Sequence, residues 1–429
     1  MIRFWQPLQN RLAAVPAAAW WALAAAAVLW MALAGNWPRV DSPETNAMRW
    51  EDIDTQTIYR EASRTTSRDM LRWWTGRWIQ REQPFYRPLI SHIFYLEYRL
   101  FDREYAAYCR VTTVFHAINA LLILWLASQL LTGPLWRRAA LGVAAVAGFC
   151  GPWGNLSTVS YVLSHWAPQT DVVSLTLGLS SLGLLLAYLR SGRAWALPAA
   201  LVVFVAGLLV KEMAVLTAVA AVLLAWHMPR RRLRVWLGYG LLTVIFLVWR
   251  RAVLPIMNYH FSGWLDFRKA GLLAATPLKD LVSSAPSGLL LWPEVGGLLA
   301  LGLAVWLLRR GVRPPLVAGA ALGVAAASAL ILAEHDPAAA LYLAVSQLPR
   351  LVAVAVFATG CWALAVRFRE WPLAALALTF LASVWIILPY PVAAPHYQYW
   401  VSAFWGLLQA EMLLPIGVTM LRWSRGQPG

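Results

Sequence analysis

The residues whose types and spacing could support chemistry are concentrated in one polar stretch between Trp50 and Leu122. Near its start, Glu51, Asp52 and Asp54 place three carboxylates within four positions. In an extended segment Asp52 and Asp54 point the same way, whereas in a helix Glu51 and Asp54 share a face. Either arrangement brings two carboxylates close enough to raise the pKa of one or to bind a divalent metal such as Mg or Mn. The pattern predicts a general base or a metal site, with a plain solvated acidic loop as the alternative.

A rigidly presented arginine follows in the same stretch. Pro88 restricts the backbone and favours an extended conformation at Arg87, so the guanidinium can be held just ahead of an apolar helix. Arginine at a membrane edge suits a bidentate grip on phosphate, and Tyr86 beside it is a further candidate for substrate binding. The alternative is an arginine that only extends to the membrane surface.

Two polar residues fall inside the helix that we expect to begin at about Tyr105. His116 and Asn119 are three positions apart and therefore face one direction. Polar residues in a lipid-bounded helix usually face the interior of a bundle or a cavity. We interpret His116 as a candidate substrate contact and Asn119 as a residue that hydrogen-bonds between helices.

Charged residues also interrupt or border the later apolar runs. Lys211 and Glu212 lie within one such run, where charges are costly unless they are paired or at the membrane edge. Lys211 could neutralise a phosphate that Glu212 orients; a structural ion pair at a turn is the competing interpretation. Asp171 opens a predicted span and is a candidate for substrate binding, with the alternative that a helix N-terminus tolerates a carboxylate for dipole reasons alone. Arg350 and His396, the latter just before the final predicted span, are further candidates for substrate binding.

The composition identifies the class of protein. Of 429 residues, 60% are hydrophobic and only 13% are charged, whereas soluble domains carry about 25% charged residues. We therefore expect an integral membrane protein, and we separately assign it to the cell's inner (plasma) membrane. The net charge is +16, and nearly all of the basic residues are arginine. In a membrane protein such an excess is explained by arginines on the cytoplasmic side of the membrane and by attraction for anionic lipid, rather than by a nucleic-acid partner. The three scattered cysteines predict neither a disulfide framework nor a zinc site.

Arginine clusters between the hydrophobic runs predict the topology. About two helix-lengths of apolar sequence separate each cluster from the next, so clusters that are all cytoplasmic enclose one hairpin per interval. This predicts a single all-α transmembrane domain over residues 1–429, with about twelve spans and a first span at 16–34. The clusters are Arg3/Arg11, Arg137/Arg138, Arg190/Arg193, Arg230–Arg232/Arg234, Arg309/Arg310/Arg313, Arg367/Arg369 and Arg422/Arg425.

The same topology places most carboxylates on the extracytoplasmic side, which is therefore the expected working face. The first outer loop, residues 36–105, is by far the longest polar segment. Within it, residues 68–81 show a helical pattern typical of an interfacial helix, and the alternative is a solvated loop helix that packs on its own protein. Its predicted apolar side is Met70, Leu71, Trp74 and Trp78, its charged side is Arg68, Arg72 and Arg81, and Trp73 and Trp78 are expected at the headgroup level.

Several motifs resemble one family. The run FYRPLISHIFYLEYRLFDREYAAYCRVTTVFHAINALL, residues 85–122, resembles the signature joining the first outer loop to the second helix in glycosyltransferases of the GT-C superfamily. These are relatives of O-mannosyltransferases that often carry tetratricopeptide repeats. LLVKEMAV (208–215) is similar to that family's Lys-Glu element, and SHWAPQTDVV (164–173) to a motif with an Asp opening a span. WEDID (50–54) stands where the family keeps its catalytic acidic pair. The resemblance covers mainly residues 50–225, about 40% of the chain.

The resemblance implies a transferase that uses a polyprenyl-phosphate sugar at the extracytoplasmic face. A first-loop carboxylate would deprotonate an acceptor hydroxyl, which attacks the anomeric carbon with inversion, while Arg87 and Lys211 stabilise the departing phosphate. The acidic pair here is Glu51-Asp52 rather than two aspartates, so the base remains open between Asp52, Asp54 and Glu51. No cofactor is certain, a divalent metal is optional, and the acceptor is unassigned.

Three other functions fit parts of the pattern. A polysaccharide polymerase or ligase also uses lipid-linked sugars, but commonly has its working loop later in the chain. A lipid-linked sugar flippase or transporter would carry ionisable residues at mid-membrane and often repeat symmetry, and neither is evident in the sequence. A non-catalytic scaffold would leave the carboxylates replaceable.

Overall fold

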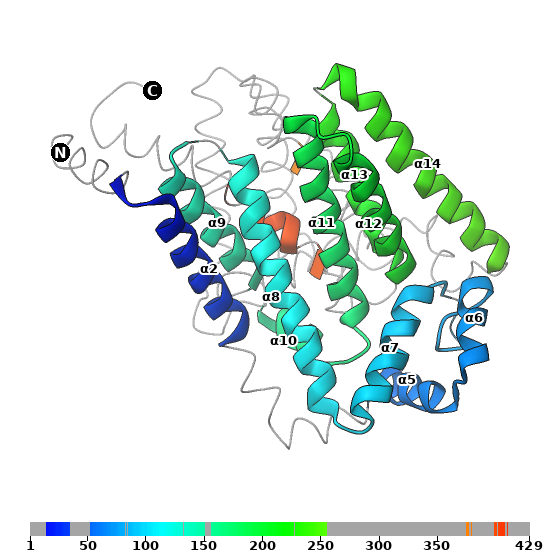
Figure 1. Ribbon diagram of the computed structural model, residues 1–429. Helices are drawn as coiled ribbons and strands as arrows, with labels where there is room; N and C mark the ends of the chain where they lie inside the picture. Colours follow the sequence, from blue (N-terminus) through cyan, green and yellow to red (C-terminus); the bar gives the residue numbers. More distant parts are fainter. Residues whose placement is uncertain are drawn as a thin grey trace, which may run out of the picture.

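The computed structural model describes residues 14–34, 52–131 without 82 and 84, 133–150, 156–226 and 228–254, with short pieces between 375 and 410. These parts are helical and contain no strand. Most of the helices lie side by side in a bundle, and three shorter ones form a lobe at its lower right (Figure 1). The lobe consists of α5 (Ile53–Arg64), α6 (Ser67–Thr75) and α7 (Pro88–Phe101). The bundle contains α2 (Ala17–Leu33), α8 (Tyr105–Leu130), α9 (Leu135–Cys150), α10 (Leu156–Ser164), α11 (Gln169–Ser191), α12 (Ala196–Val210), the 3₁₀ turn η1 (Glu212–Ala214), α13 (Val215–Ala225) and α14 (Pro229–Val253).

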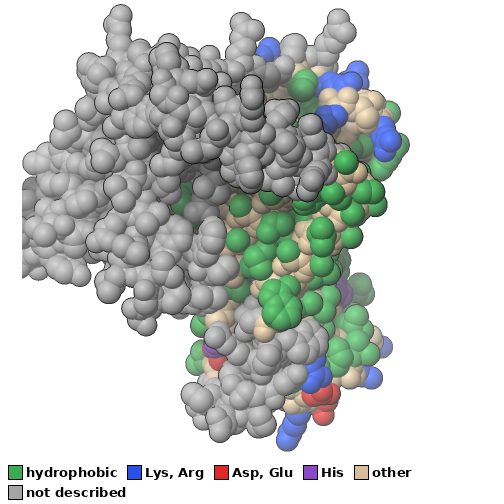
Figure 2. Space-filling view, turned by 90° about the vertical axis from the view of Figure 1, so that its left-hand side faces the viewer, with side chains coloured by type: hydrophobic (Ala, Val, Ile, Leu, Met, Phe, Trp, Pro, Cys, Tyr) green, Lys and Arg blue, Asp and Glu red, His purple; other side chains and the backbone are tan. Residues whose placement is uncertain are grey.

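Three of the described helices are long and apolar enough to cross a membrane. They are α8, α11 and the 231–253 part of α14; α2, α12 and the 212–225 segment are shorter apolar helices. At 1.5 Å per residue, a 26-residue helix such as α8 extends about 39 Å, which exceeds the hydrocarbon core of about 30 Å. Figure 2 shows an apolar band on the described surface between an arginine-rich end and an end of mixed charge.

The boundaries of these helices agree with the sequence predictions. The first apolar helix covers 17–33, α8 begins at Tyr105, and Asp171 lies in the first turn of α11. The apolar run around Lys211 divides into α12 and α13, because Lys211 adopts an extended conformation after α12 ends at Val210. The predicted outer loops and spans beyond residue 254 lie outside the described residues, apart from the short pieces near the C-terminus.

Arginines from three predicted clusters gather at one end of the bundle, shown at the top in Figure 1. Arg138 donates to the Ser128 carbonyl at 3.2 Å and Arg190 to the Gln129 side chain at 2.8 Å, both near the end of α8. Arg231 of α14 donates to the Tyr188 carbonyl at 2.6 Å, in the last turn of α11. Cations there complement the negative C-terminal ends of helices. The described clusters therefore share one face, as the sequence predicts.

The lobe helices are defined by their capping residues. The Asp52 side chain accepts from the Thr55 amide at 2.9 Å and starts α5, while Thr66 and Asp69 form a capping box that starts α6. Pro88 occupies the first position of α7, where its missing N–H costs nothing. These local signals fix three short helices without help from the membrane.

The predicted interfacial helix at 68–81 is wrong in its length and in its buried side. The helix ends at Thr75, before Gly76. Trp73 is only 1% exposed because its ring packs edge-on against His92 and Tyr95 of α7, whereas Leu71 is 74% exposed. Trp73 and Trp78 are thus core residues of the lobe, which agrees with the alternative of a loop helix packed on its own protein. The apolar-versus-arginine pattern did not account for the packing of α7 against α6.

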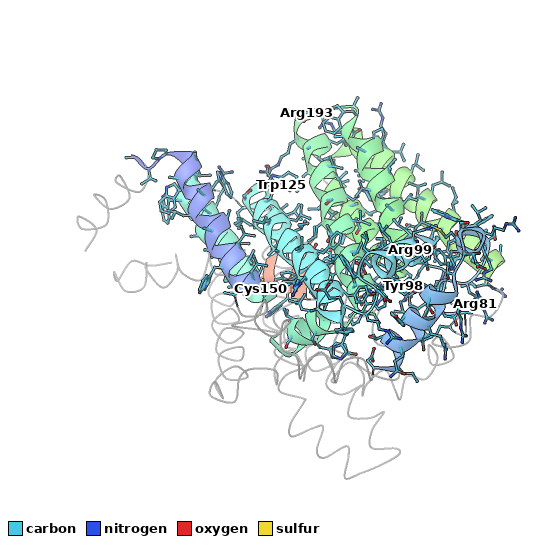
Figure 3. All side chains as sticks on the ribbon, turned by 60° about the horizontal axis from the view of Figure 1, so that its bottom comes forward. Arg81, Tyr98, Arg99, Trp125, Cys150 and Arg193 are labelled. Atoms are coloured by element: carbon cyan, nitrogen blue, oxygen red, sulfur yellow. The ribbon has the colours of Figure 1, made fainter. Side chains whose placement is uncertain are left out.

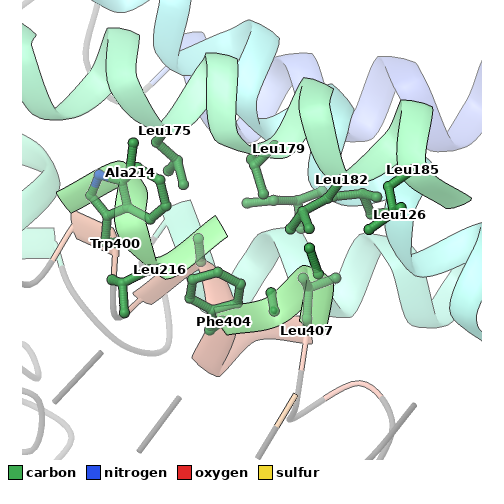
Figure 4. Packing of buried hydrophobic residues seen from close by; sticks show 14 of the residues in the cluster. Leu126, Leu175, Leu179, Leu182, Leu185, Ala214, Leu216, Trp400, Phe404 and Leu407 are labelled. Carbon is green, nitrogen blue, oxygen red and sulfur yellow. The ribbon is translucent and has the colours of Figure 1, made fainter. Parts of the chain in front are cut away.

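The core of the bundle is centred on α11. Figure 4 shows leucines of this helix, from Leu175 to Leu185, packed against Trp400, Phe404 and Leu407 of a C-terminal piece. A second core joins the lobe to the bundle, where the Trp166 ring stacks on Tyr108 with ring centroids 4.0 Å apart. By contrast, α14 exposes most of its apolar side chains, as expected of a helix at the lipid boundary.

A close backbone approach tests the placement of the C-terminal piece. A Cβ on Gly406 would lie 2.3 Å from the carbonyl oxygen of Ala145 in α9. We expect Gly406→Ala to lower the free energy of unfolding by about 1–3 kcal/mol, because backbone must move. Gly240→Ala in α14 is the matched control, since its Cβ meets nothing within 4 Å. Thermal unfolding of the purified proteins in detergent measures both, and equal melting temperatures for wild type and Gly406→Ala would contradict this packing.

Candidate functional site

The candidate site lies at the end of the bundle opposite the arginine clusters. Three segments that are distant in sequence meet there: the start of α7, the first turn of α11 and the turn between α12 and α13. They carry four charged residues that we call the charge cluster: Arg87, Asp171, Lys211 and Glu212. Figure 3 labels Tyr98 and Arg99 near the end of α7 in the adjoining lobe, and Arg193 at the opposite end of the bundle.

Arg87 and Glu212 form a bidentate ion pair. Arg87 Nε donates to Glu212 Oε2 at 3.1 Å, and Nη2 donates to Oε1 at 2.7 Å. The two side chains are 7% and 19% exposed. The guanidinium also stacks 4.0 Å from the centroid of the Phe85 ring. This planar fork is the geometry that distinguishes arginine from lysine, and it joins the lobe to the α12–α13 turn.

Lys211 pairs with a different carboxylate. Its Nζ lies 2.7 Å from Asp171 Oδ2, and the two side chains are 3% and 0% exposed. The other oxygen, Asp171 Oδ1, is buried without a hydrogen-bond partner in the described structure. Lys211 and Glu212 therefore do not pair with each other as a local ion pair at the turn. Each one ties the turn to another helix.

The two ion pairs are close enough to influence each other. Arg87 and Glu212 both act electrostatically on Asp171 and on Lys211. Positive and negative groups alternate, so the four charges compensate one another within an apolar surrounding. Removing one partner of such a pair leaves an uncompensated buried charge, which typically costs about 3–5 kcal/mol.

The first-loop carboxylates lie at the same end. Asp52 caps α5, and Asp54 Oδ1 accepts from the amides of Gln80 at 3.4 Å and Gln83 at 3.1 Å. Both carboxylates are half-buried rather than fully solvated. Burial raises the pKa of the Tyr161 phenol in α10, and the charges of Asp52, Asp54 and Asp171 raise it further. The pKa of this one phenol is thus raised both by the first-loop carboxylates and by Asp171 of the charge cluster. Glu51 lies outside the described residues.

Tyr86 connects the lobe to α14. Its hydroxyl donates to the Trp74 carbonyl at 3.1 Å and accepts from Trp249 Nε1 at 2.9 Å. The side chain is buried, and burial raises the pKa of its phenol. Tyr86 therefore sets the position of the last turn of α14 beside Arg87.

His116 and Asn119 lie deeper in the bundle. His116 Nδ1 is 2.7 Å from the Tyr399 hydroxyl, and Asn119 Nδ2 donates to the Val172 carbonyl of α11 at 3.0 Å. The interhelical hydrogen bond predicted for Asn119 is confirmed. His116 is fully buried, with Cys150 Sγ 3.6 Å from its Nε2, so it anchors the C-terminal piece to α8. Arg350 and His396 lie outside the described residues.

Metal binding has no ready ligand set in the part of the chain that the structure describes. No group of three or more His, Cys, Asp or Glu side chains converges there. In the charge cluster the carboxylate oxygens of Glu212 and Asp171 accept from Arg87 and Lys211. These two cations therefore occupy the positions that a metal ion would take beside the carboxylates.

Two further charged residues near this end are not among the candidate site residues singled out from the sequence. Glu97 of α7 is buried and accepts from Trp166 Nε1 at 2.7 Å and from Gln169 Nε2 at 2.6 Å. Burial raises its pKa to about 7, despite these hydrogen bonds. A carboxylate between apolar and aromatic neighbours was the available signal. The second residue, Arg250, lies in the last turn of α14, close enough to act electrostatically on Glu212.

The Arg87–Glu212 pair generates a first prediction. Glu212→Met should lower the free energy of unfolding by about 3–5 kcal/mol because it leaves Arg87 buried without its main partner. Adding Arg87→Met to that variant should restore most of the loss. The exposed pair of Glu104 and Arg110 is the control, where Glu104→Gln should change stability by less than about 1 kcal/mol. Thermal unfolding provides the double-mutant cycle, and additive losses would exclude a coupled pair.

Glu97 generates a second prediction, on pH. Its folded pKa of about 7 exceeds the ordinary value, so its contribution to stability is present at low pH and is lost as pH rises through about 7. Glu97→Gln should remove about 2–3 kcal/mol of the difference in unfolding free energy between pH 5 and pH 8. Glu104→Gln is again the control. An unchanged pH dependence in Glu97→Gln would show that Glu97 does not titrate in this range.

Comparisons with known proteins do not identify the family of this chain. No protein-family model, no curated protein and no solved structure matches the chain. The function is therefore inferred from the site and from the sequence motifs alone.

Proposed function

We propose that this chain is a GT-C type membrane glycosyltransferase that moves a sugar from a polyprenyl-phosphate donor to an acceptor hydroxyl, with inversion. The single observation that carries the proposal is that two sets of groups lie at one end of the bundle. They are the half-buried carboxylates of the segment before α7 and the buried charge cluster, and both sets act electrostatically on Tyr161. Sugar transfer from a lipid phosphate needs this combination of acidic and basic groups at a membrane edge.

The carboxylates supply the proton acceptor. In the proposed step the acceptor oxygen attacks the anomeric carbon, the bond from that carbon to the phosphate oxygen breaks, and the hydroxyl proton passes to Asp52 or Asp54. A base must be held in place to do this. The amides of Gln80 and Gln83 hold Asp54, and one oxygen of Asp52 is held by the start of α5.

Cations near the leaving group complete the mechanism. Negative charge develops on the phosphate as the bond to the sugar breaks, and preorganised positive groups stabilise that charge. Arg87 and Lys211 are fixed by their carboxylate partners, so they need no reorganisation during the reaction. A divalent metal, if one takes part, would act in the same way.

The proposed orientation follows from the arginines. Positive residues favour the cytoplasmic side, which assigns the end with Arg138, Arg190 and Arg231 to the cytoplasm and the site to the extracytoplasmic face of the plasma membrane. The complete chain would then have about twelve spans. Its partners would be the lipid-linked donor, membrane lipid and an acceptor that is a protein, a lipid or a glycan.

Asp52 and Asp54 provide the test of this function. Purified protein incubated with a panel of polyprenyl-phosphate sugars should yield transferred sugar by mass spectrometry. Asp52→Asn or Asp54→Asn should lower kcat by about 100-fold or more, and the more affected variant identifies the base. Asn remains a good helix N-cap, so Asp52→Asn keeps α5 while removing the charge.

Glu104→Gln removes an exposed carboxylate from the same region and should keep full activity. Full activity in both aspartate variants would remove the first-loop carboxylates from the mechanism. Transfer that depends on an undecaprenyl-diphosphate oligosaccharide would favour the polymerase or ligase instead. Movement of lipid-linked sugar across a vesicle membrane without transfer would favour the flippase.

A further inference from the structure

The charges around Glu212 do not sum to zero once Arg250 is included. Within the charge cluster, Arg87 and Lys211 are each hydrogen-bonded to a carboxylate. Arg250 is a third cation that acts electrostatically on Glu212, but both oxygens of Glu212 already accept from Arg87. Among the described residues, three cations therefore face two carboxylates, an excess of one positive charge that a bound anion would compensate.

Arg250 also has unused hydrogen-bonding capacity. Its Nε is buried and has no hydrogen-bond partner in the described structure. Among the described residues its side chain forms no hydrogen bond or ion pair, whereas an orphaned buried donor on a charged group typically costs several kcal/mol. A ligand that accepts from Arg250 would remove that cost.

The structure holds Arg250 in place. The preceding residue, Trp249, donates to the Tyr86 hydroxyl at 2.9 Å, and Tyr86 directly precedes Arg87. The last turn of α14 is thereby fixed against the start of α7. Because α14 is the bundle helix with the most exposed apolar surface among those described, Arg250 lies where a lipid lying along the protein would present its headgroup.

Arg250 also lies away from the predicted arginine clusters of the described bundle. The predicted clusters on α9, α11 and α14 lie at the other end, where they cap helices (Figure 1). Arg250 and Arg251 end α14 at the site end, where the topology rule does not require them. A guanidinium with free donors at a membrane edge is suited to phosphate.

We infer that Arg250 binds the phosphate group of a membrane-associated phosphate ester, in the space beside the Arg87–Glu212 pair. The inference deepens the proposed function, on which it rests for the lipid-linked nature of that ester. It adds Arg250 to Arg87 and Lys211 as a third cation beside the donor phosphate, and the only one of the three without a carboxylate hydrogen bond among the described residues.

Binding of geranyl phosphate to the full chain in phosphatidylcholine nanodiscs tests the inference, with tryptophan fluorescence as the readout. Wild type should bind geranyl phosphate and not geraniol. Arg250→Ala should raise Kd by about 10- to 100-fold, and Arg250→Lys should recover part of the loss. Arg251→Ala, which removes the exposed neighbour, should stay within about twofold of wild type. Inorganic phosphate and phosphatidylglycerol arms distinguish a free phosphate or a bulk lipid headgroup from an isoprenoid ester.

The inference would be overturned if Arg250→Ala kept wild-type affinity, or if Arg250→Ala and Arg251→Ala lost affinity equally. It would also be overturned if the wild-type protein did not bind geranyl phosphate. Melting temperatures of the variants show whether they are folded, and Arg250→Gln replaces Arg250→Ala if the latter unfolds. The sugar-transfer assay separates this result from the proposed function. Phosphate binding that depends on Arg250 without any transfer would remove only the transferase. Transfer that is unaffected in Arg250→Ala would remove only the inference.

Discussion

The compensation of buried charges at one end of the helical bundle is the constraint on which the described structure depends. Arg87, Asp171, Lys211 and Glu212 come from segments that no local sequence signal would join, and each would be costly if it were alone in an apolar surrounding. Their pairing dictates where α7 meets the α12–α13 turn and where that turn meets α11. The need to pair these buried charges therefore determines the shape of the site as much as apolar packing does.

The division of labour between lobe and bundle follows from the same constraint. The bundle core around α11 consists of leucine and aromatic packing, which holds helices together but specifies little about their ends. The lobe core around Trp73, Tyr108 and Trp166 is aromatic, and the buried Glu97 joins α7 to the start of α11 through Trp166 and Gln169. Polar contacts thus determine the orientation of the lobe, while apolar packing supplies most of its burial.

Hydropathy and the spacing of charges were enough to place several bundle helices, but not their partners. The start of α8 at Tyr105 and the break at Lys211 are visible because apolar runs and charges alternate along the chain. Sequence spacing could not show that Lys211 pairs with Asp171 and Glu212 with Arg87, because adjacent opposite charges favour a local pair. Arg250 was overlooked for a related reason: an arginine at the end of a span is ordinarily attributed to topology. The buried side of α6 was misassigned because it is decided by α7, which contributes His92 and Tyr95.

The separation of 125 residues between Arg87 and Glu212 has a consequence for biogenesis. During synthesis the segment carrying Arg87 emerges from the ribosome long before α12 and the turn that contains its partner. Until the later segment has been inserted, the guanidinium must stay hydrated or near lipid headgroups, since a bare cation is not stable in the apolar interior. The Arg87–Glu212 contact between the lobe and the bundle therefore forms late in assembly, after α12 and α13 have been inserted.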